Sequence, residues 1–270
     1  MKHEVIHLCP DDENITLTSF IQITKEEKTD ALLVIPGGGY SQVCSDREGE
    51  NICITFAALG MKCFWLNYST KEKSKFPRPL YEASLAMIYI KEHAEEYGID
   101  PERIFVVGFS AGGHLAASLG TLWHLPELNE MLGKPYGMNR PCGMILSYPV
   151  LCYFETTHMG TFRNAMGTQT PSEADIERVS LERHVDEKTV PAFIWHTADD
   201  PGVDVRNSIM YMNALAKNKI YFESHIYPHG PHGMALANST THIREGFTDN
   251  RIAEWPRLAR EWMKTIPSNK

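Results

Sequence analysis

The 270-residue sequence predicts an α/β fold, in which one mostly parallel sheet of eight strands has helices on both faces. Two observations support this prediction. Behind an N-terminal pair of strands, six strand-like runs alternate with helical or irregular segments, an order typical of parallel sheets. Some of these runs, such as residues 31–35, are continuously apolar, which is typical of strands buried on both faces. We expect a single domain over residues 1–270.

The composition limits the function classes that fit. Hydrophobic residues make up 43% and charged residues 22% of the chain, enough for a sizeable core. The formal net charge of −8 argues against a protein that binds nucleic-acid phosphates. No apolar run is long enough to span a membrane, and residues 1–7 lack an apolar signal core, so we expect a cytoplasmic protein. The six cysteines form no C-x-x-C pair, so we expect reduced thiols and no zinc site.

The first strands are expected at residues 4–8 and 15–23, as a hairpin around a polar turn, and a charged turn follows at 25–30. The buried strand 31–35 then leads into Pro36-Gly37-Gly38-Gly39-Tyr40. Three consecutive glycines favour neither strand nor helix, and they leave backbone N–H groups unshielded. The stretch alone indicates a flexible loop. Its place after a buried strand also makes it a candidate anion-binding loop.

The rest of the chain is expected to alternate between helices and strands. Helices are expected at residues 46–60, 80–97, 204–218 and 251–266, and further strands at 62–68, 103–107, 142–149, 191–196 and 221–227. Residues 123–141 are expected to be irregular. The segment 150–190 has little sustained periodicity and would lie over the mouth of the sheet, either as a lid or as ordinary surface packing.

A serine stands at the apex of a strand–turn–helix pattern, Gly108-Phe109-Ser110-Ala111-Gly112. The strand 103–107 precedes it and the small, helix-compatible run 115–120 follows it. This is the G-x-S-x-G pattern of a nucleophile elbow, in which a strained turn projects the serine oxygen clear of the sheet. By itself the pattern fits equally well with a glycine-rich turn that carries a capping serine.

Three loops at the carboxyl ends of predicted parallel strands carry Ser110, then Asp199 or Asp200, then His232. In this order a histidine can act as the base for the serine, and a carboxylate can orient the imidazole. His232 is preferred over His229 because a loop with a following glycine leaves its ring room. We expect structural roles for the other histidines considered, namely His114, His196 and His225.

The oxyanion of an acyl-transfer intermediate needs aligned donors. The N–H group of Ala111, directly after the serine, is one candidate, and those of Gly38 and Gly39 are the others. Tyr40, at the end of the same loop, is a candidate substrate-binding residue. The chemistry requires no metal and no cofactor.

The chain resembles the esterase/lipase branch of the α/β-hydrolases, and within it the bacterial acetyl-xylan-esterase-like or "sugar hydrolase" group. The resemblance runs from about residue 30 to the end. It is carried by Pro36-Gly37-Gly38-Gly39-Tyr40, Asp46-Arg47-Glu48-Gly49, Leu66-Asn67-Tyr68, Gly98-Ile99-Asp100-Pro101, Gly108-Phe109-Ser110-Ala111-Gly112-Gly113-His114, Trp195-His196-Thr197-Ala198-Asp199-Asp200 and Pro228-His229-Gly230-Pro231-His232-Gly233.

The resemblance implies the register of the acid loop. Many hydrolases of this type read His-Gly-x-x-Asp-x-x-Val-Pro there, and His196 with Val203 then places the acid on Asp200. Asp204 stands where the pattern has proline. Pro36 likewise replaces a common histidine, a change that keeps the backbone donors. The pair Arg47-Glu48 would either bind a polar substrate or, as we favour, brace the glycine loop.

The expected function is that of a serine carboxylesterase for short acyl esters, above all acetyl groups on sugars or oligosaccharides. The alternatives are a serine peptidase-like hydrolase and a non-catalytic small-molecule binder on a hydrolase scaffold. The expected partner is a small-molecule ester, with no nucleic acid and no membrane. The sequence leaves open whether the chain forms a homo-oligomer.

Overall fold

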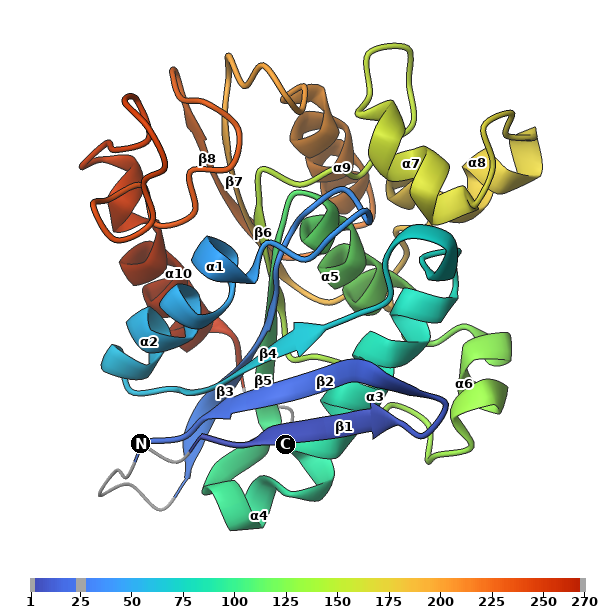
Figure 1. The fold of residues 1–270 in the computed structure, drawn as a ribbon, viewed down its shortest axis with the longest axis vertical. Coiled ribbons are helices and arrows are strands. Elements are labelled where there is room, and N and C mark those ends of the chain that lie inside the picture. Colours follow the sequence, from blue (N-terminus) through green and yellow to red (C-terminus); the bar gives the residue numbers. More distant parts are fainter. Residues whose placement is uncertain (1–2, 23–27, 268–270) are drawn as a thin grey trace.

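A computed structural model of the chain describes residues 3–22 and 28–267, and its described strands form one sheet with the order β1-β2-β4-β3-β5-β6-β7-β8 (Figure 1). The strands are β1 (Val5–Cys9), β2 (Asp12–Phe20), β3 (Thr29–Ile35), β4 (Lys62–Asn67), β5 (Ile99–Phe109), β6 (Met144–Ser147), β7 (Ala192–Thr197) and β8 (Phe222–Tyr227). β2 pairs antiparallel with both β1 and β4, and the other neighbours pair in parallel. The predicted fold class is confirmed.

Helices cover both faces of the sheet. They are α1 (Ser45–Glu48), α2 (Glu50–Ala58), α3 (Arg78–Glu92), α4 (Ala94–Tyr97), α5 (Ala111–Leu122), α6 (Pro126–Leu132), α7 (Met159–Met166), α8 (Glu173–Val179), α9 (Arg206–Lys217) and α10 (Trp255–Thr265). In β3, Leu32 and Val34 pack into the core cluster beneath α2 and α10, and Leu33 and Ile35 into the cluster beneath α3, α5 and α9. The strand is therefore apolar on both faces because each face carries its own core.

Some predicted boundaries were wrong. The helix expected at 46–60 is interrupted at Gly49, where an added Cβ would lie 2.7 Å from the carbonyl oxygen of Ser45. The helix expected at 80–97 begins earlier, at Arg78, and is interrupted at His93. The irregular segment 123–141 contains α6. Of the charged turn expected at 25–30, residues 25–27 lie outside the described residues, and residues 29 and 30 belong to β3.

The segment 150–190 contributes α7 and α8, which Figure 1 shows at the upper right of the molecule, next to α9. Among its hydrogen bonds to the centre of the fold, one reaches the glycine loop and one reaches the helix after Ser110. The side-chain amide of Asn164 donates to the carbonyl oxygen of Gly39 (2.8 Å), and the carbonyl oxygen of Val179 accepts from the ring of His114 (2.8 Å). The segment therefore covers part of the glycine loop. A lid function for this segment remains a prediction from the sequence.

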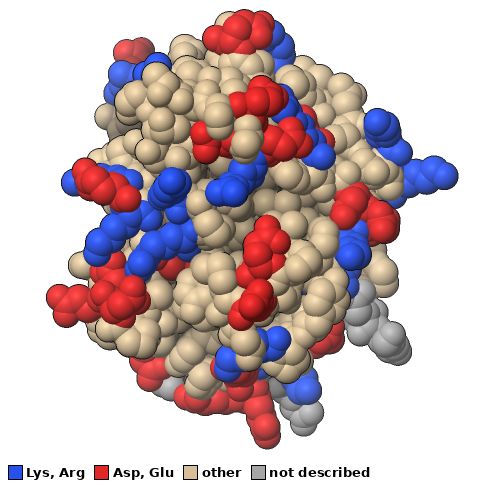
Figure 2. All heavy atoms as spheres, turned by 90° about the vertical axis from the view of Figure 1, so that its right-hand side faces the viewer, with Lys and Arg blue, Asp and Glu red and all other residues tan. Residues whose placement is uncertain are grey.

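The surface carries charges of both signs. Figure 2 shows basic side chains lying close to acidic ones on a face that is otherwise mostly uncharged. Ion pairs between solvent-exposed side chains include Lys134–Glu92 (2.6 Å) and Arg183–Glu177 (2.7 Å). In the described part of the chain, no helix combines the length and the apolar character needed to cross a membrane.

Candidate active site

Ser110 lies in a strained turn between β5 and α5. Its backbone φ is +52° and its ψ is −116°, a conformation that residues other than glycine rarely adopt. The strain is held from both sides, because the N–H of Ser110 donates to the carbonyl oxygen of Ser147 (3.0 Å) and its own carbonyl accepts from the N–H groups of His114 and Val150 (each 3.1 Å). Strain that the surroundings maintain in this way is typical of functional sites.

The two glycines of the elbow are required by close backbone contacts. A Cβ on Gly108 would lie 2.1 Å from the carbonyl oxygen of Gly112. A Cβ on Gly112 would lie 2.2 Å from the carbonyl oxygen of Ile35, at the end of β3. The turn can therefore approach both its own helix and the neighbouring strand only because these positions have no side chain.

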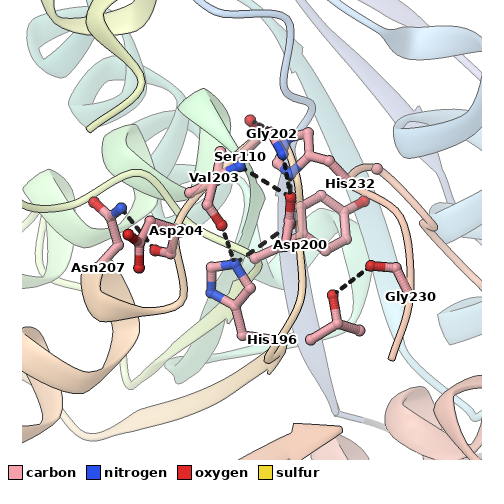
Figure 3. A network of polar contacts seen from close by, with 12 residues as sticks. Ser110, His196, Asp200, Gly202, Val203, Asp204, Asn207, Gly230 and His232 are labelled. Carbon is pink, nitrogen blue, oxygen red and sulfur yellow. Dashed lines mark hydrogen bonds and ion pairs between the residues drawn. The ribbon is translucent and has the colours of Figure 1, made fainter. Parts of the chain in front are cut away.

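The structure brings Ser110, His232 and Asp200 together in one chain of hydrogen bonds (Figure 3). Nε2 of His232 lies 2.8 Å from Oγ of Ser110, and Nδ1 lies 2.8 Å from Oδ2 of Asp200. A carboxylate only accepts hydrogen bonds, so the proton sits on Nδ1 and Nε2 accepts the serine hydroxyl. His232 is thus in the tautomer that a general base for Ser110 needs.

Asp200 is 8% exposed and fully hydrogen-bonded. Its Oδ1 accepts the N–H groups of Gly202 (2.8 Å) and Val203 (2.9 Å), and Nε2 of His196 lies 3.4 Å from its Oδ2. Burial acts to raise the pKa of Asp200, but the hydrogen bonds from His196 and His232 outweigh it and hold this pKa well below its usual range. Asp200 is therefore a carboxylate beside the imidazole of His232.

The rival residues form a separate pair. Nδ1 of His229 lies 2.8 Å from Oδ2 of Asp199, and the N–H of Gly230 donates to the other oxygen of Asp199 (2.9 Å). The His229 side chain is 80% exposed. Neither residue contacts Ser110 through a hydrogen bond described for this structure, so the geometry favours Asp200 and His232 over their sequence neighbours.

The three other histidines considered make contacts within the fold, as expected. His196 is fully buried, and its ring bridges Ser208 (2.8 Å) and the carbonyl oxygen of Val203 (3.0 Å). His114 is fully buried below the elbow. His225 bonds to Glu223 within β8 (2.9 Å).

The three expected oxyanion donors make no hydrogen bond with any other part of the described chain. Gly38 and Gly39 have φ angles of +124° and +65°, and a Cβ on Gly38 would lie 2.2 Å from the carbonyl oxygen of Gln42. Ala111 is the first residue of α5, so its N–H has no partner within the helix. Within the described residues, these three backbone N–H groups therefore have no hydrogen-bond acceptor.

Tyr40 does not line this site, which corrects the substrate-binding role expected for it. The side chain is 2% exposed, and its hydroxyl lies 2.9 Å from Nδ1 of His114. Its ring packs edge-on against Tyr68 and His114, with centroids 5.8 Å apart in each case. Tyr40 anchors the glycine loop in the core instead of reaching a substrate.

Arg47 and Glu48 contact the loops of the site. Glu48, which is 2% exposed, accepts the N–H of Gly37 (2.8 Å), and Nη1 of Arg47 donates to the carbonyl oxygen of Gly233 (3.3 Å). These contacts agree with the bracing role that the sequence favoured over substrate binding.

Sequence reasoning missed His158, which lies just before α7. Its Nδ1 accepts from the hydroxyl of Thr161 (2.9 Å), and its Cε1 is 3.9 Å from where a Cβ on Gly39 would be. Partial burial, and next the nearby His232, lower the pKa of His158. The segment 150–190 thus presents a neutral imidazole at the glycine loop, and no pattern in the sequence pointed to it. Among the described residues, no group of three or more His, Cys, Asp or Glu side chains could hold a metal ion.

The fold and the serine–histidine–aspartate geometry define an α/β hydrolase. The model of the BD-FAE family matches residues 20–215, so the chain belongs to the BD-FAE family.

Solved structures match the chain over nearly its full length. The acetyl ester-xyloside bifunctional hydrolase of Caldicellulosiruptor lactoaceticus has a TM-score of 0.85 and 32% identity, covering 97% of this chain and 96% of that one. The carboxylesterase Cest-2923 of Lactobacillus plantarum WCFS1 has a TM-score of 0.84 and 29% identity, covering 98% and 97%.

Curated relatives are longer proteins. Endo-1,4-beta-xylanase B of Butyrivibrio fibrisolvens is 38% identical over 219 residues, which are 78% of this chain and 33% of that protein. Acetylxylan esterase of Xylanibacter ruminicola is 27% identical over 244 residues, which are 89% of this chain and 46% of that protein. The chain thus spans a third to just under half the length of these two relatives.

Proposed function

We propose that the chain is a serine carboxylesterase that hydrolyses short-chain acyl esters through a Ser110–His232–Asp200 triad. The observation that carries this proposal is the continuous pair of 2.8 Å hydrogen bonds from Ser110 through His232 to Asp200. The three available N–H groups of Gly38, Gly39 and Ala111 support it, because they supply the second feature that acyl transfer needs.

In the acylation step, Oγ of Ser110 attacks the ester carbonyl carbon while Nε2 of His232 takes the hydroxyl proton. Asp200 stabilises the imidazolium, and the N–H groups of Gly38, Gly39 and Ala111 donate to the oxyanion. Loss of one such donor typically raises the barrier by about 3 kcal/mol. His232 then gives its proton to the leaving alcohol as the C–O bond breaks. Water repeats the sequence on the acyl-enzyme, and the acid and Ser110 are released.

For the substrate, we propose acetyl groups on sugars or small oligosaccharides. The support comes from the relatives, since one is named as an acetylxylan esterase and a solved neighbour as an acetyl ester-xyloside hydrolase. A cytoplasmic location remains a prediction from the sequence.

The direct test is turnover of 4-nitrophenyl acetate, and of acetylated xylo-oligosaccharides, by wild type and Ser110→Ala. Loss of a nucleophile typically lowers turnover by about 10⁴-fold or more. Ser118→Ala is the matched control, because Ser118 is a buried serine of α5, the helix that follows Ser110, and its hydroxyl donates to the carbonyl oxygen of His114. Wild-type turnover in Ser110→Ala would refute the proposal. Turnover of the nitrophenyl ester without release of acetate from the oligosaccharides would refute only the sugar substrate.

A further inference from the structure

Two loops of the site lie far apart in the sequence and must keep a fixed spacing. The glycine loop, residues 36–40, carries two of the three oxyanion donors. The loop after β8, residues 228–237, carries His232. No strand pairing joins them, because β3 and β8 are separated in the sheet by β5, β6 and β7. The sheet therefore links the two loops only through three intervening strands, and contacts between the loops can fix their spacing more directly.

The buried carboxylate of Glu48 holds one of these loops. Its Oε2 accepts the N–H of Gly37 at 2.8 Å, and the carbonyl oxygen of Gly37 accepts the N–H of Cys44 at 3.0 Å. Both polar groups of Gly37 are thus fixed. A Cβ on Gly37 would lie 2.9 Å from Glu48 Oε2 and 3.1 Å from Cβ of Ser110, so this residue is confined between the carboxylate and the serine. Gly38 and Gly39 follow directly from it.

The other oxygen of Glu48 reaches the second loop through Tyr148, which comes directly after β6. The Tyr148 hydroxyl donates to Glu48 Oε1 (2.8 Å) and accepts the N–H of Ala235 (3.0 Å). The ring packs edge-on against that of His232, with centroids 5.1 Å apart and planes at 74°. Tyr148 has a φ of +38°, unusual for a residue with a side chain. Tyr148, which is strained and buried, therefore contacts the His232 ring and also the backbone of the loop that carries His232.

Arg47 adds a parallel connection between the same two loops. Its guanidinium donates to the carbonyl oxygen of Gly233, next to His232, at 3.3 Å. Burial acts to lower the pKa of Arg47, but the neighbouring Glu48 and Cys44 outweigh this and raise it, so it stays charged. The helix α1 thus sends two adjacent side chains to the two loops.

We propose that Glu48 and Tyr148 are positioning residues that set the oxyanion donors of the glycine loop against His232. The inference rests on the proposed function and extends it to groups that touch no substrate. A hydrogen bond to a buried carboxylate is strong and directional, so the chain Gly37–Glu48–Tyr148–Ala235 transmits the position of one loop to the other. Donors that are displaced lose mainly transition-state stabilisation, which lowers kcat and leaves KM nearly unchanged.

The experiment compares Tyr148→Phe with Tyr211→Phe. Tyr211 is the matched control, because it is equally buried and its hydroxyl bonds to Thr121 (2.6 Å), away from the site. For Tyr148→Phe we expect kcat on 4-nitrophenyl acetate to fall about 10- to 100-fold, below the effect of deleting a donor outright. KM should stay within about twofold. We expect Tyr211→Phe to leave kcat unchanged. The melting temperatures of Tyr148→Phe and Tyr211→Phe should fall by similar amounts, because each variant loses one buried hydroxyl group.

Two further measurements separate positioning from general damage. Affinity for a boronic acid, which forms a tetrahedral adduct on the nucleophile, should fall in Tyr148→Phe by the same factor as kcat/KM. At Glu48, the glutamine variant keeps one oxygen acceptor and should retain more activity than Glu48→Leu, which keeps none. If Tyr148→Phe does not fold, the Glu48 pair gives the answer.

The proposal is overturned if Tyr148→Phe keeps wild-type kcat, if its boronate affinity is unchanged, or if Glu48→Gln and Glu48→Leu are equally active. A failure of the proposed function would look different, because turnover in the wild type would then not depend on Ser110.

Discussion

The buried histidine below the elbow should make the chain acid-sensitive. His114 is fully buried, and both ring nitrogens are occupied. The carbonyl oxygen of Val179 can only accept, so Nε2 carries the proton (2.8 Å), and Nδ1 accepts the hydroxyl of Tyr40 (2.9 Å). Protonation of Nδ1 would place a charge in the core without a counter-charge, and burial accordingly lowers the pKa of His114 from 6.5 to about 4.

The sign of the effect follows from linkage. The folded-state pKa of His114 lies below the unfolded one, so as the pH falls below 6.5 the unfolded chain takes up a proton that the folded chain refuses. The free energy of unfolding therefore falls between pH 6.5 and about 4. Below that range, His114 causes no further loss of stability. At about 1.4 kcal/mol per pH unit, the loss is about 3 kcal/mol in full and about 2 kcal/mol between pH 7 and pH 4.5.

The test is urea unfolding of wild type and His114→Gln at pH 7 and at pH 4.5. The glutamine amide can donate to Val179 and accept from Tyr40, but it does not titrate. We expect the wild type to lose about 2 kcal/mol more than the variant over this interval, at equal m-values. Other titrating groups are common to both proteins and cancel in the difference. Equal losses would refute the assigned burial and hydrogen bonding of His114.

Two further predictions concern the site itself. Asp200→Asn should lower turnover of 4-nitrophenyl acetate by about 10⁴-fold, because the imidazole of His232 loses the carboxylate that fixes its tautomer. Asp199→Asn, which disturbs only the exposed pair with His229, should stay within about twofold of wild type; comparable losses in the two variants would contradict the geometry. Gly112→Ala should give little folded protein and a melting temperature several degrees lower, because its Cβ would lie 2.2 Å from the carbonyl oxygen of Ile35. A thermal melt checks this, and a wild-type melting curve would show that the elbow tolerates a side chain.

The features that could be predicted from the sequence are those set by local pattern. The continuous apolar run of β3 predicted a strand buried on both faces, and Gly108, Ser110 and Gly112 predicted the turn that the structure contains. The turn can be recognised from a few neighbouring residues. Its glycines are needed because the turn makes close contacts with its own helix and with the adjacent strand.

The features that could not be predicted depend on partners far along the chain. Tyr40 was expected to bind substrate because it stands at the end of the glycine loop. Its actual hydrogen-bond partner, His114, is 74 positions away, so nothing near Tyr40 in the sequence indicated that its side chain is buried. Glu48 and Tyr148 are 100 positions apart, and nothing near either residue indicates the other. Asp199 and Asp200 are neighbours after the same strand, so residue type alone does not say which side chain turns inward. The turn geometry decides it, with the N–H groups of Gly202 and Val203 holding Asp200.

In this chain, the segment 150–190 and the strand ends that carry Ser110, Asp200 and His232 are separate parts of the site. This separation affects how the substrate preference of such proteins can change. The segment is inserted between β6 and β7 and supplies none of the three residues of the hydrogen-bonded chain, yet it touches the glycine loop through Asn164 and brings His158 beside it. Mutations there can reshape the approach to Ser110 while the strand ends that carry the reacting groups stay as they are. Laboratory evolution toward esters with a different alcohol part should therefore begin in this segment. Mutations there can change the substrate preference without removing the residues that carry out hydrolysis.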